Sequence, residues 1–229
     1  MGRREEKALN RPKEIFERLL SFDRGYRGVV AGVDEAGRGP WAGPVVAAAV
    51  ILDPAGVSGL EGVDDSKKLS EKKREAFFDI ITSASLCYAI SEVSNRFIDE
   101  QNILSATLTA MKGCIEKLSV KPEIILIDGT HCPKADFTGM EAVKDGDAKS
   151  LSIAAASILA KVHRDRAMRN FDKLYPGYGF SGHKGYGTAA HAEAIKKLGI
   201  CPIHRVSYKP VKEFIDGEGN KLEEKRGGN

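Results

Sequence analysis

Apolar residues along the chain follow two different periods, one typical of strands and one typical of helices. Short runs rich in valine and isoleucine predict strands over residues 29–33, 44–52, 86–93, 124–127 and 140–143. Apolar residues at helical spacing predict helices over about 1–28, 70–84, 99–118, 150–174 and 188–197. Strands and helices alternate without a sequence repeat, which predicts an α/β fold with a mixed sheet and helices on both faces.

The same pattern divides the chain into three parts. We expect an amphipathic helical extension over 1–28, one main domain over 29–213 that includes a helical C-terminal region, and a polar tail over 214–229. No apolar run reaches the roughly 18 residues of a membrane span, and the N-terminus has no apolar signal core. The four cysteines are far apart, which favours free thiols. These features predict a cytoplasmic monomer without a membrane partner.

Acidic residues follow two of the predicted strands and precede a predicted helix. Asp34 and Glu35 end the first strand, Asp128 ends a later one, and Asp145 and Asp147 lie just before the helix over 150–174. Functional sites in open α/β sheets gather at strand ends. Carboxylates that converge there repel one another unless divalent cations bridge them, and hard oxygen ligands favour Mg²⁺ or Mn²⁺. Two such ions are a recurring arrangement for phosphodiester hydrolysis.

Positive charge is concentrated in the C-terminal third. The whole chain carries a net charge of only +3, but residues 161–209 hold ten Lys and Arg against three acids. Aromatic residues are interleaved in the same segment, among them Tyr175, Tyr178, Phe180, Tyr186 and Tyr208. A basic segment with interleaved aromatics suits a nucleic acid, although a solvated basic face with core aromatics has the same composition. Together with the acidic residues, this segment favours a nuclease.

Other chemistries fit the sequence less well. Gly37, Gly39 and Gly43 have G-x-G-x-x-x-G spacing, and a strand-like run follows them where a dinucleotide-binding turn needs a helix. The chain has neither a P-loop nor a G-x-S-x-G nucleophile motif. Two alternatives stay open. One is a protein that binds a nucleic-acid hybrid without catalysing its cleavage, and the other is a metal-dependent hydrolase of small molecules. The extended basic surface argues against the second.

Five segments, in this order, resemble the pattern of bacterial ribonuclease HII. They are DEAGRGP at 34–40, DSKKL at 65–69, IDG at 127–129, IAAASILAKV at 153–162 with Arg164-Asp165, and HKGY at 183–186. The resemblance spans residues 29 to about 211. The related ribonuclease HIII carries a sizeable extra N-terminal domain, whereas only a short segment precedes the first strand here, which favours HII.

The resemblance implies a ribonuclease H-like fold with a helical C-terminal part. It implies endonucleolytic cleavage of RNA in RNA–DNA hybrids and at single ribonucleotides embedded in duplex DNA. Two Mg²⁺ or Mn²⁺ ions would serve this cleavage and leave 5′-phosphate and 3′-hydroxyl ends. The four-carboxylate site of the family maps onto Asp34, Glu35, Asp128 and Asp147, with Asp145 and Asp165 as alternatives for the fourth position.

The resemblance also implies how the substrate is chosen. The turn Gly37-Arg38-Gly39 would recognise the ribonucleotide, because its two glycines let the backbone approach the 2′-hydroxyl. Tyr186 would pack on the next deoxyribose and sense the RNA-to-DNA junction. The candidate phosphate contacts are Lys67 and Lys184 and, further, Lys161 and Arg164. Phosphate contacts give affinity without sequence preference, so binding should weaken steeply with salt.

Overall fold

The computed structural model describes residues 3–63, 66, 69–134, 136–137 and 139–216, without the side chains of residues 3–11. The chain divides into two compact units. The first, which we call the sheet unit, is formed by Met1–Ala36, Val46–Glu92 and Thr107–His163. The second, the helical unit, is formed by Gly37–Val45, Val93–Ala106 and Arg164–Asn229. Helix α5 (Leu151–Leu174) belongs to the sheet unit up to His163 and to the helical unit from Arg164.

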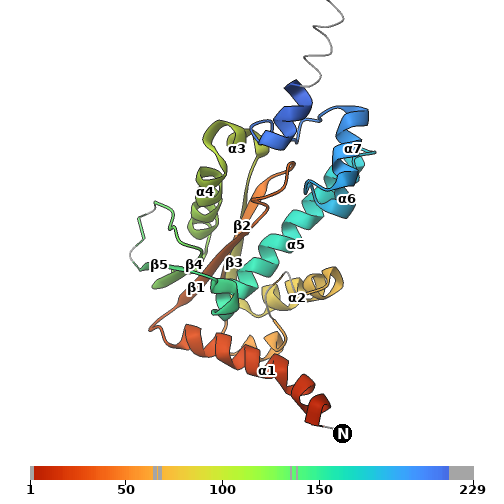
Figure 1. The fold of residues 1–229 in the computed structure, drawn as a ribbon. Coiled ribbons are helices and arrows are strands. Elements are labelled where there is room, and N and C mark those ends of the chain that lie inside the picture. The colour runs from red at the N-terminus through yellow and green to blue at the C-terminus, as the bar shows by residue number, and fades with distance from the viewer. Residues whose placement is uncertain (1–2, 64–65, 67–68, 135, 138, 217–229) are drawn as a thin grey trace, which may run out of the picture. The chain divides into compact units, whose positions relative to one another are not determined.

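A five-stranded mixed sheet forms the centre of the sheet unit (Figure 1). Its strands, in the order β3-β2-β1-β4-β5, are β1 (Val30–Ala36), β2 (Val45–Leu52), β3 (Ser85–Val93), β4 (Ile124–Asp128) and β5 (Met140–Val143). Strand β1 runs antiparallel to β2 and parallel to β4, and β4 runs parallel to β5. In the β1–β4 register Val33 pairs with Ile127, so the next residue on each strand is an aspartate. The register therefore brings Asp34 beside Asp128.

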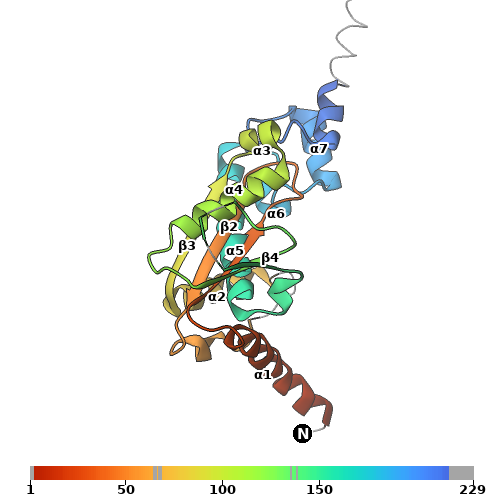
Figure 2. The ribbon, with the colours of Figure 1, turned by 90° about the vertical axis from the view of Figure 1, so that its left-hand side faces the viewer.

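Helices cover both faces of this sheet. Apolar residues of α1 (Arg3–Arg24), β2, the short helix η1 (Val57–Leu60), α2 (Glu71–Ser83) and α5 form one buried core. Helix α4 (Ile103–Glu116) lies along the other face, where a Cβ on Gly113 would come within 2.6 Å of the Ser91 hydroxyl on β3 (Figures 1 and 2). The predicted α/β class, with a mixed sheet flanked by helices, is confirmed.

Helix α5 packs directly against strand β1. A Cβ built on Gly32 would lie only 2.1 Å from the Ser152 backbone, so only glycine fits at this crossing. The small residues of α5 from Ile153 to Ala160 are buried, which lets the helix backbone approach the sheet.

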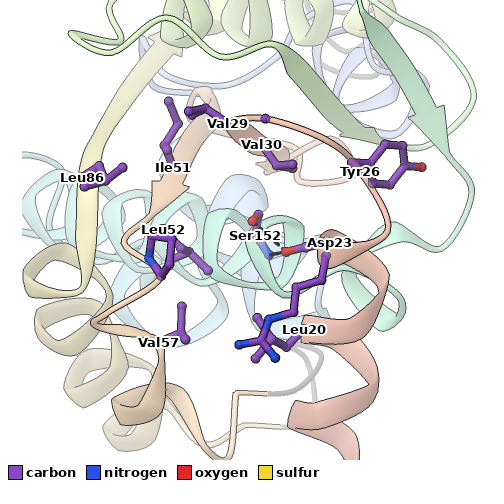
Figure 3. Close-up of a pocket in the computed structure, with 13 residues that line it drawn as sticks. Leu20, Asp23, Tyr26, Val29, Val30, Ile51, Leu52, Val57, Leu86 and Ser152 are labelled. Atoms are coloured by element: carbon purple, nitrogen blue, oxygen red, sulfur yellow. Dashed lines mark hydrogen bonds between the residues drawn. The ribbon is translucent and has the colours of Figure 1, made fainter.

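The first turn of α5 is capped from α1. Asp23, whose pKa is raised by burial, accepts hydrogen bonds from the Ser152 N–H and hydroxyl, both at 2.8 Å (Figure 3). A carboxylate at a helix N-terminus satisfies donors that lack a partner within the helix. Both residues line a largely apolar pocket of about 300 Å³ that includes Leu52, Val57 and Leu86 and is separate from the acidic residues at the strand ends.

The helical unit has a core of its own. Its helices include α3 (Asn95–Gln101), α6 (Phe180–His183), α7 (Ala189–Leu198) and helical residues 209–216. Seven buried residues form the centre of this core: Ala42, Met168, Tyr178, Phe180, Ile195, Cys201 and Ile203. Within the described part of the chain, no helix combines the length and apolar character that a bilayer crossing needs.

The sequence-based element predictions differ from the structure at three places. Strand β1 continues to Ala36, beyond the predicted end at residue 33, so Asp34 and Glu35 lie within the strand. The single helix predicted over 99–118 is wrong: α3 and α4 are separated by Asn102, which has a left-handed φ of 76°. The segment between the predicted helices over 150–174 and 188–197 contains the short helix α6, for which the sequence pattern predicted no element.

Ser70 lies at the predicted start of the helix over 70–84 and caps α2, since its side chain accepts from the Lys73 N–H. The division into an extension, a main domain and a tail stays a prediction, and residues 217–229 of the predicted tail lie outside the described residues.

Candidate active site

Three carboxylates converge at the ends of β1 and β4. Asp34, Glu35 and Asp128 each offer a carboxylate oxygen, and these oxygens lie within 4.8 Å of one another. Asp34 is buried, with 5% of its surface exposed, while Glu35 and Asp128 are half-buried. The parallel register of β1 and β4 explains the convergence, because the two strands end side by side at the same edge. This is the arrangement that the sequence predicted for these three residues.

The electrostatics of this cluster fit a divalent cation. Burial, followed by the charges of Glu35 and Asp128, raises the pKa of Asp34 well above its ordinary value. The Glu35 N–H, 2.7 Å from Asp34 Oδ1, and the Ser157 hydroxyl act in the opposite direction. Several carboxylates share one partly buried place, so a hard divalent cation would relieve their repulsion and ligate their oxygens. The residues present therefore suit Mg²⁺ or Mn²⁺.

The loop after β5 lies against Asp128. Asp128 Oδ1 accepts from the Gly146 N–H at 2.6 Å, and a Cβ on Gly146 would approach the same oxygen to 3.1 Å. Asp147 is the next residue, in the short helix η2 (Gly146–Ala148). It directly follows Gly146, the residue that donates to Asp128, but it is not part of the three-carboxylate group. Its role as a metal ligand therefore stays a prediction. Of the alternatives for the fourth carboxylate, Asp145 is exposed, and Asp165 is buried on α5 in the helical unit.

Two serines connect Asp34 to the DSKKL segment. The Ser157 hydroxyl hydrogen-bonds to Asp34, and its Oγ lies 2.9 Å from the Ser66 Oγ. An ionised carboxylate only accepts, so Ser157 donates to Asp34 and in turn accepts from Ser66. Arg74 donates to the Ser66 carbonyl at 2.9 Å, so Ser66 is held by both its side chain and its backbone. Lys67 lies outside the described residues, and its phosphate contact stays a prediction.

In the helical unit, a buried arginine holds the turn that carries Gly37, Arg38 and Gly39. Arg205, which has none of its surface exposed, donates to the carbonyls of Gly37 at 2.6 Å, Arg38 at 2.9 Å and Gly43 at 2.9 Å. The Tyr208 hydroxyl donates to the Arg38 carbonyl at 2.7 Å. Gly37 has a φ of 99°, which an L side chain rarely adopts. The turn is therefore fixed from behind, while Arg38 and Gly39 are exposed.

Arg164 is a second buried arginine and serves a neighbouring stretch. Its guanidinium donates to the carbonyls of Pro44 at 3.0 Å, Ala42 at 3.1 Å and Lys184 at 2.9 Å. Burial and the nearby charge of Arg205 lower its pKa to about 10. With 1% of its surface exposed, Arg164 is not available to a phosphate in this structure, contrary to the sequence-based expectation.

Tyr186 and Lys184 lie on one loop but differ in exposure. Tyr186 is 45% exposed, and its ring lies beside Gly39, whose Cβ position is 3.7 Å from Tyr186 Cε1. Lys184 is buried, and its ammonium group donates to the Ser181 carbonyl. The structure thus presents the Tyr186 ring at the surface together with the glycine turn, as a substrate contact requires. A phosphate contact by Lys184 stays a prediction and would require its side chain to leave this position.

Comparison with known proteins identifies the family. Residues 31–211 match the family model described as ribonuclease HII. The chain belongs to the ribonuclease HII family. Two curated relatives named ribonuclease HII are 52% identical over 205 residues, from Endomicrobium trichonymphae, and 55% identical over 212 residues, from Acetivibrio thermocellus. The matches cover 88% and 92% of this chain, and 97% and 80% of the relatives.

Solved structures agree with this assignment. The ribonuclease H2 of Pyrococcus horikoshii matches with a TM-score of 0.69 and 29% identity, over 81% of this chain and 96% of that one. A ribonuclease HII of Archaeoglobus fulgidus, solved in complex with PCNA, matches with a TM-score of 0.65 and 29% identity, over the same shares. A ribonuclease HIII solved with Mn²⁺ (TM-score 0.63, 19% identity, 88% of this chain and 72% of that one) supports the fold alone.

As a ribonuclease HII, the chain is a metal-dependent endoribonuclease with ribonuclease H activity, and its family acts on RNA–DNA hybrids. Family membership removes the two alternatives that the sequence left open. Sequence reasoning missed Arg205, the buried structural role of Arg164 and the clustering of three histidines in the helical unit. No spacing signal marks these residues, because their partners are distant along the chain; Arg205 and Gly37, for example, are 168 positions apart.

Proposed function

We propose that the chain hydrolyses the RNA strand of RNA–DNA hybrids and also cuts at single ribonucleotides embedded in duplex DNA. Cleavage leaves 5′-phosphate and 3′-hydroxyl ends, and its role is the removal of ribonucleotides from DNA during replication and repair. The observation that carries the proposal is the convergence of Asp34, Glu35 and Asp128 in a chain of the ribonuclease HII family. The enzyme acts as a cytoplasmic monomer.

The three carboxylates, with Asp147 as the fourth, would hold two Mg²⁺ or Mn²⁺ ions. When bound there, such ions supply an activated water and stabilise the attacking and leaving oxygens of an in-line displacement. The chain's own contribution is to orient the carboxylates through hydrogen bonds. Ser157 donates to Asp34, and the Gly146 N–H donates to Asp128, so two of the ligands are fixed before a substrate arrives.

Ribonucleotide choice is assigned to the turn Gly37-Arg38-Gly39 and to Tyr186. Distinguishing RNA from DNA requires contact with the 2′-hydroxyl. Gly39 is exposed and lacks a side chain, so a sugar can approach the backbone beside the Tyr186 ring. The exposed ring of Tyr186 then packs on the deoxyribose that follows the ribonucleotide. Lys67 and Lys184 are proposed to contact phosphates.

Cleavage of a labelled duplex that contains one ribonucleotide tests the proposal. We expect metal-dependent incision that EDTA abolishes, and no incision of the matched all-DNA duplex. Asp34→Asn should lower the rate by at least about a hundredfold with the fold intact, because it removes a ligand charge from the cluster. A near wild-type rate for Asp34→Asn would refute the metal site.

The fourth carboxylate is tested by a matched pair of variants. Asp147→Asn should lose activity, whereas Asp145→Asn, two residues away and exposed, should not. The opposite result would assign the role to Asp145. Separate titrations of the wild type with Mg²⁺ and Mn²⁺ identify the preferred ion.

The junction role of Tyr186 is tested by comparing two substrates. Tyr186→Ala should reduce cleavage at the single ribonucleotide more than cleavage of a continuous hybrid, since only the first requires the following deoxyribose contact. An unchanged ratio of the two rates would remove this role while leaving the metal site in place.

A further inference from the structure

Three histidines of the helical unit form a connected cluster beside the loop that carries Tyr186. His191 and His204 are buried, with 0% and 1% of their surface exposed, and His183 is partly buried. The rings of His183 and His191 stack with centroids 4.4 Å apart and planes 15° apart. His191 Nε2 lies 3.1 Å from His204 Nε2. The function proposed above does not use this cluster.

The hydrogen-bond partners determine which nitrogen of each ring carries the proton. The Cys201 N–H donates to His204 Nδ1 at 2.8 Å, so the proton of His204 is on Nε2. The Cys201 carbonyl is also 3.2 Å from Nδ1, but a proton there would meet the Cys201 N–H. His204 Nε2–H therefore donates to His191 Nε2, which leaves the proton of His191 on Nδ1.

The third ring follows the same logic. The Gly185 N–H donates to His183 Nδ1 at 3.1 Å, so His183 carries its proton on Nε2 and donates it to the Tyr178 carbonyl at 2.8 Å. All three rings are thus neutral, and each ring nitrogen has a partner. An added proton on any ring would face an existing N–H donor and break a hydrogen bond.

The cluster holds the backbone of Tyr186. His191 Nδ1–H donates to the Tyr186 carbonyl at 3.0 Å, and His183 accepts from the preceding N–H, that of Gly185. The Tyr186 N–H donates to the His183 carbonyl at 2.9 Å. The peptide groups on both sides of Tyr186 are therefore fixed, while its ring is 45% exposed. The Thr188 N–H also donates to the Tyr186 carbonyl, at 2.8 Å.

We propose that His191, oriented by His204, is a positioning residue for Tyr186 and thereby sets the preference for an RNA-to-DNA junction. The inference rests on the proposed function, since it needs Tyr186 to read the deoxyribose. A hydrogen bond from His191 to the Tyr186 carbonyl fixes the direction in which the ring leaves the backbone. Preorganised contacts of this kind lower the cost of ordering a side chain on substrate binding.

A purely packing role for His191 would have different consequences. The ring also contacts Trp41, with centroids 5.6 Å apart, and the edge of Phe180, with centroids 5.5 Å apart. If these contacts were its whole role, any side chain of similar volume would serve equally well. The position of the hydrogen-bond donor would not matter, and every substrate would be affected alike.

Two substitutions at His191 separate these roles. The amide N–H of Asn occupies about the place of Nδ1, so His191→Asn keeps the donor to the Tyr186 carbonyl and loses the bond to His204. The amide of Gln reaches the place of Nε2, so His191→Gln keeps the bond to His204 and loses the donor. The measured quantity is kcat/KM for a duplex with one ribonucleotide, divided by kcat/KM for a continuous hybrid.

We expect His191→Gln to lower this ratio about tenfold, the effect of one lost hydrogen bond, and His191→Asn to preserve it within about threefold. In a Tyr186→Ala background, His191→Gln should have no further effect on the ratio. Equal ratios for the two variants, or effects that multiply with Tyr186→Ala, would overturn the proposal. If Tyr186→Ala changes the ratio and His191→Gln does not, the positioning role of His191 is refuted and the junction role of Tyr186 stands. If neither variant changes the ratio, both roles are refuted.

Nitrogen NMR of the wild-type enzyme gives a test that needs no variant. Among these three rings, the side-chain ¹⁵N shifts should show a protonated Nδ1 in His191 and a protonated Nε2 in His183 and His204. A different tautomer at His191 would mean that it cannot donate to Tyr186 and would refute the proposal.

Discussion

Arg205 should be the main support of the turn that carries Gly37, Arg38 and Gly39. Its guanidinium donates to four carbonyls of the stretch from Gly37 to Pro44 and to the Tyr208 hydroxyl. Replacing it by methionine, Arg205→Met, keeps much of the buried aliphatic stem but removes every donor. The carbonyls that lose a partner belong to Gly37, Arg38, Gly43 and Pro44. The Pro44 carbonyl keeps its bond from Arg164, and the Arg38 carbonyl keeps its bond from Tyr208.

The magnitude follows from those carbonyls. Two of the four, those of Gly37 and Gly43, lose their Arg205 bonds and gain no replacement donor from the substitution. Leaving a buried acceptor unsatisfied costs about 1–3 kcal/mol each. Removing the buried charge offsets part of this loss, because an arginine inside the protein is itself costly to desolvate. We expect Arg205→Met to lower the free energy of unfolding by about 3 kcal/mol, or roughly 6–12 °C in Tm for a chain of this size.

Urea unfolding measures the stability loss, and the ratio of cleavage rates at a ribonucleotide and in a continuous hybrid measures the functional loss. Arg205→Lys should recover only a small part of the stability, because an ammonium group cannot serve carbonyls in several directions at once. Lys212→Met, at an exposed position, controls for the change of charge. If Arg205→Lys were as stable as the wild type, the multidentate role of Arg205 would be refuted.

Three further predictions concern stability and the metal site. Burial lowers the pKa of His191 to about 4 from an ordinary 6.5, so its contribution to stability is complete above pH 6.5 and falls by about 3 kcal/mol as the pH drops to 4. Urea unfolding across this range should show a loss of stability that is smaller by about that amount in His191→Asn than in the wild type, because only His204, whose pKa burial also lowers, still takes up a proton there. Gly32→Ala should lower the free energy of unfolding by about 2–3 kcal/mol, because the added Cβ pushes α5 from the sheet. Gly59→Ala is the control: its Cβ would lie 3.5 Å from the nearest side chain, so the same assay should show little loss of stability. Ser157→Ala removes a hydrogen-bond donor that favours the ionised form of Asp34. Calorimetry should then show metal binding that is about tenfold weaker or more, and the pH–rate profile should move to higher pH. An unchanged profile would exclude a role of Ser157 in the ionisation of Asp34.

The acidic cluster could be predicted because it depends on strand order and on residue type at strand ends. Asp34 and Asp128 each come directly after a short apolar run, and parallel strands place such positions at one edge. The exact membership of the site is harder to predict. Asp147 is in a loop whose conformation depends on Asp145 in the left-handed region and on the bond from Gly146 to Asp128. Local sequence does not specify these tertiary contacts.

Helix boundaries show the same limit. The apolar pattern predicts one helix across Asn102, because asparagine is only mildly unfavourable in a helix. In the structure Asn102 has positive φ, and its side chain accepts from the Ser105 N–H at 3.0 Å, which starts α4 as a new helix. Asp99 in α3 accepts from the N–H groups of Val206 and Ser207, more than 100 positions away. A partner so distant in sequence cannot be found from hydrophobic periodicity.

We expect the buried polar residues of the helical unit to link cleavage with ribonucleotide choice. Glu35 and Gly37 are two residues apart, so their Cα atoms are at most about 7 Å apart in any conformation of the chain. A ligand of the proposed metal site is therefore covalently tied to the start of the turn. The turn itself is held by Arg205 on its carbonyl side, within the helical unit. A sugar that did not fit the turn would meet this fixed backbone, and moving the turn would break several buried hydrogen bonds at once. We therefore expect the turn to discriminate against such a sugar.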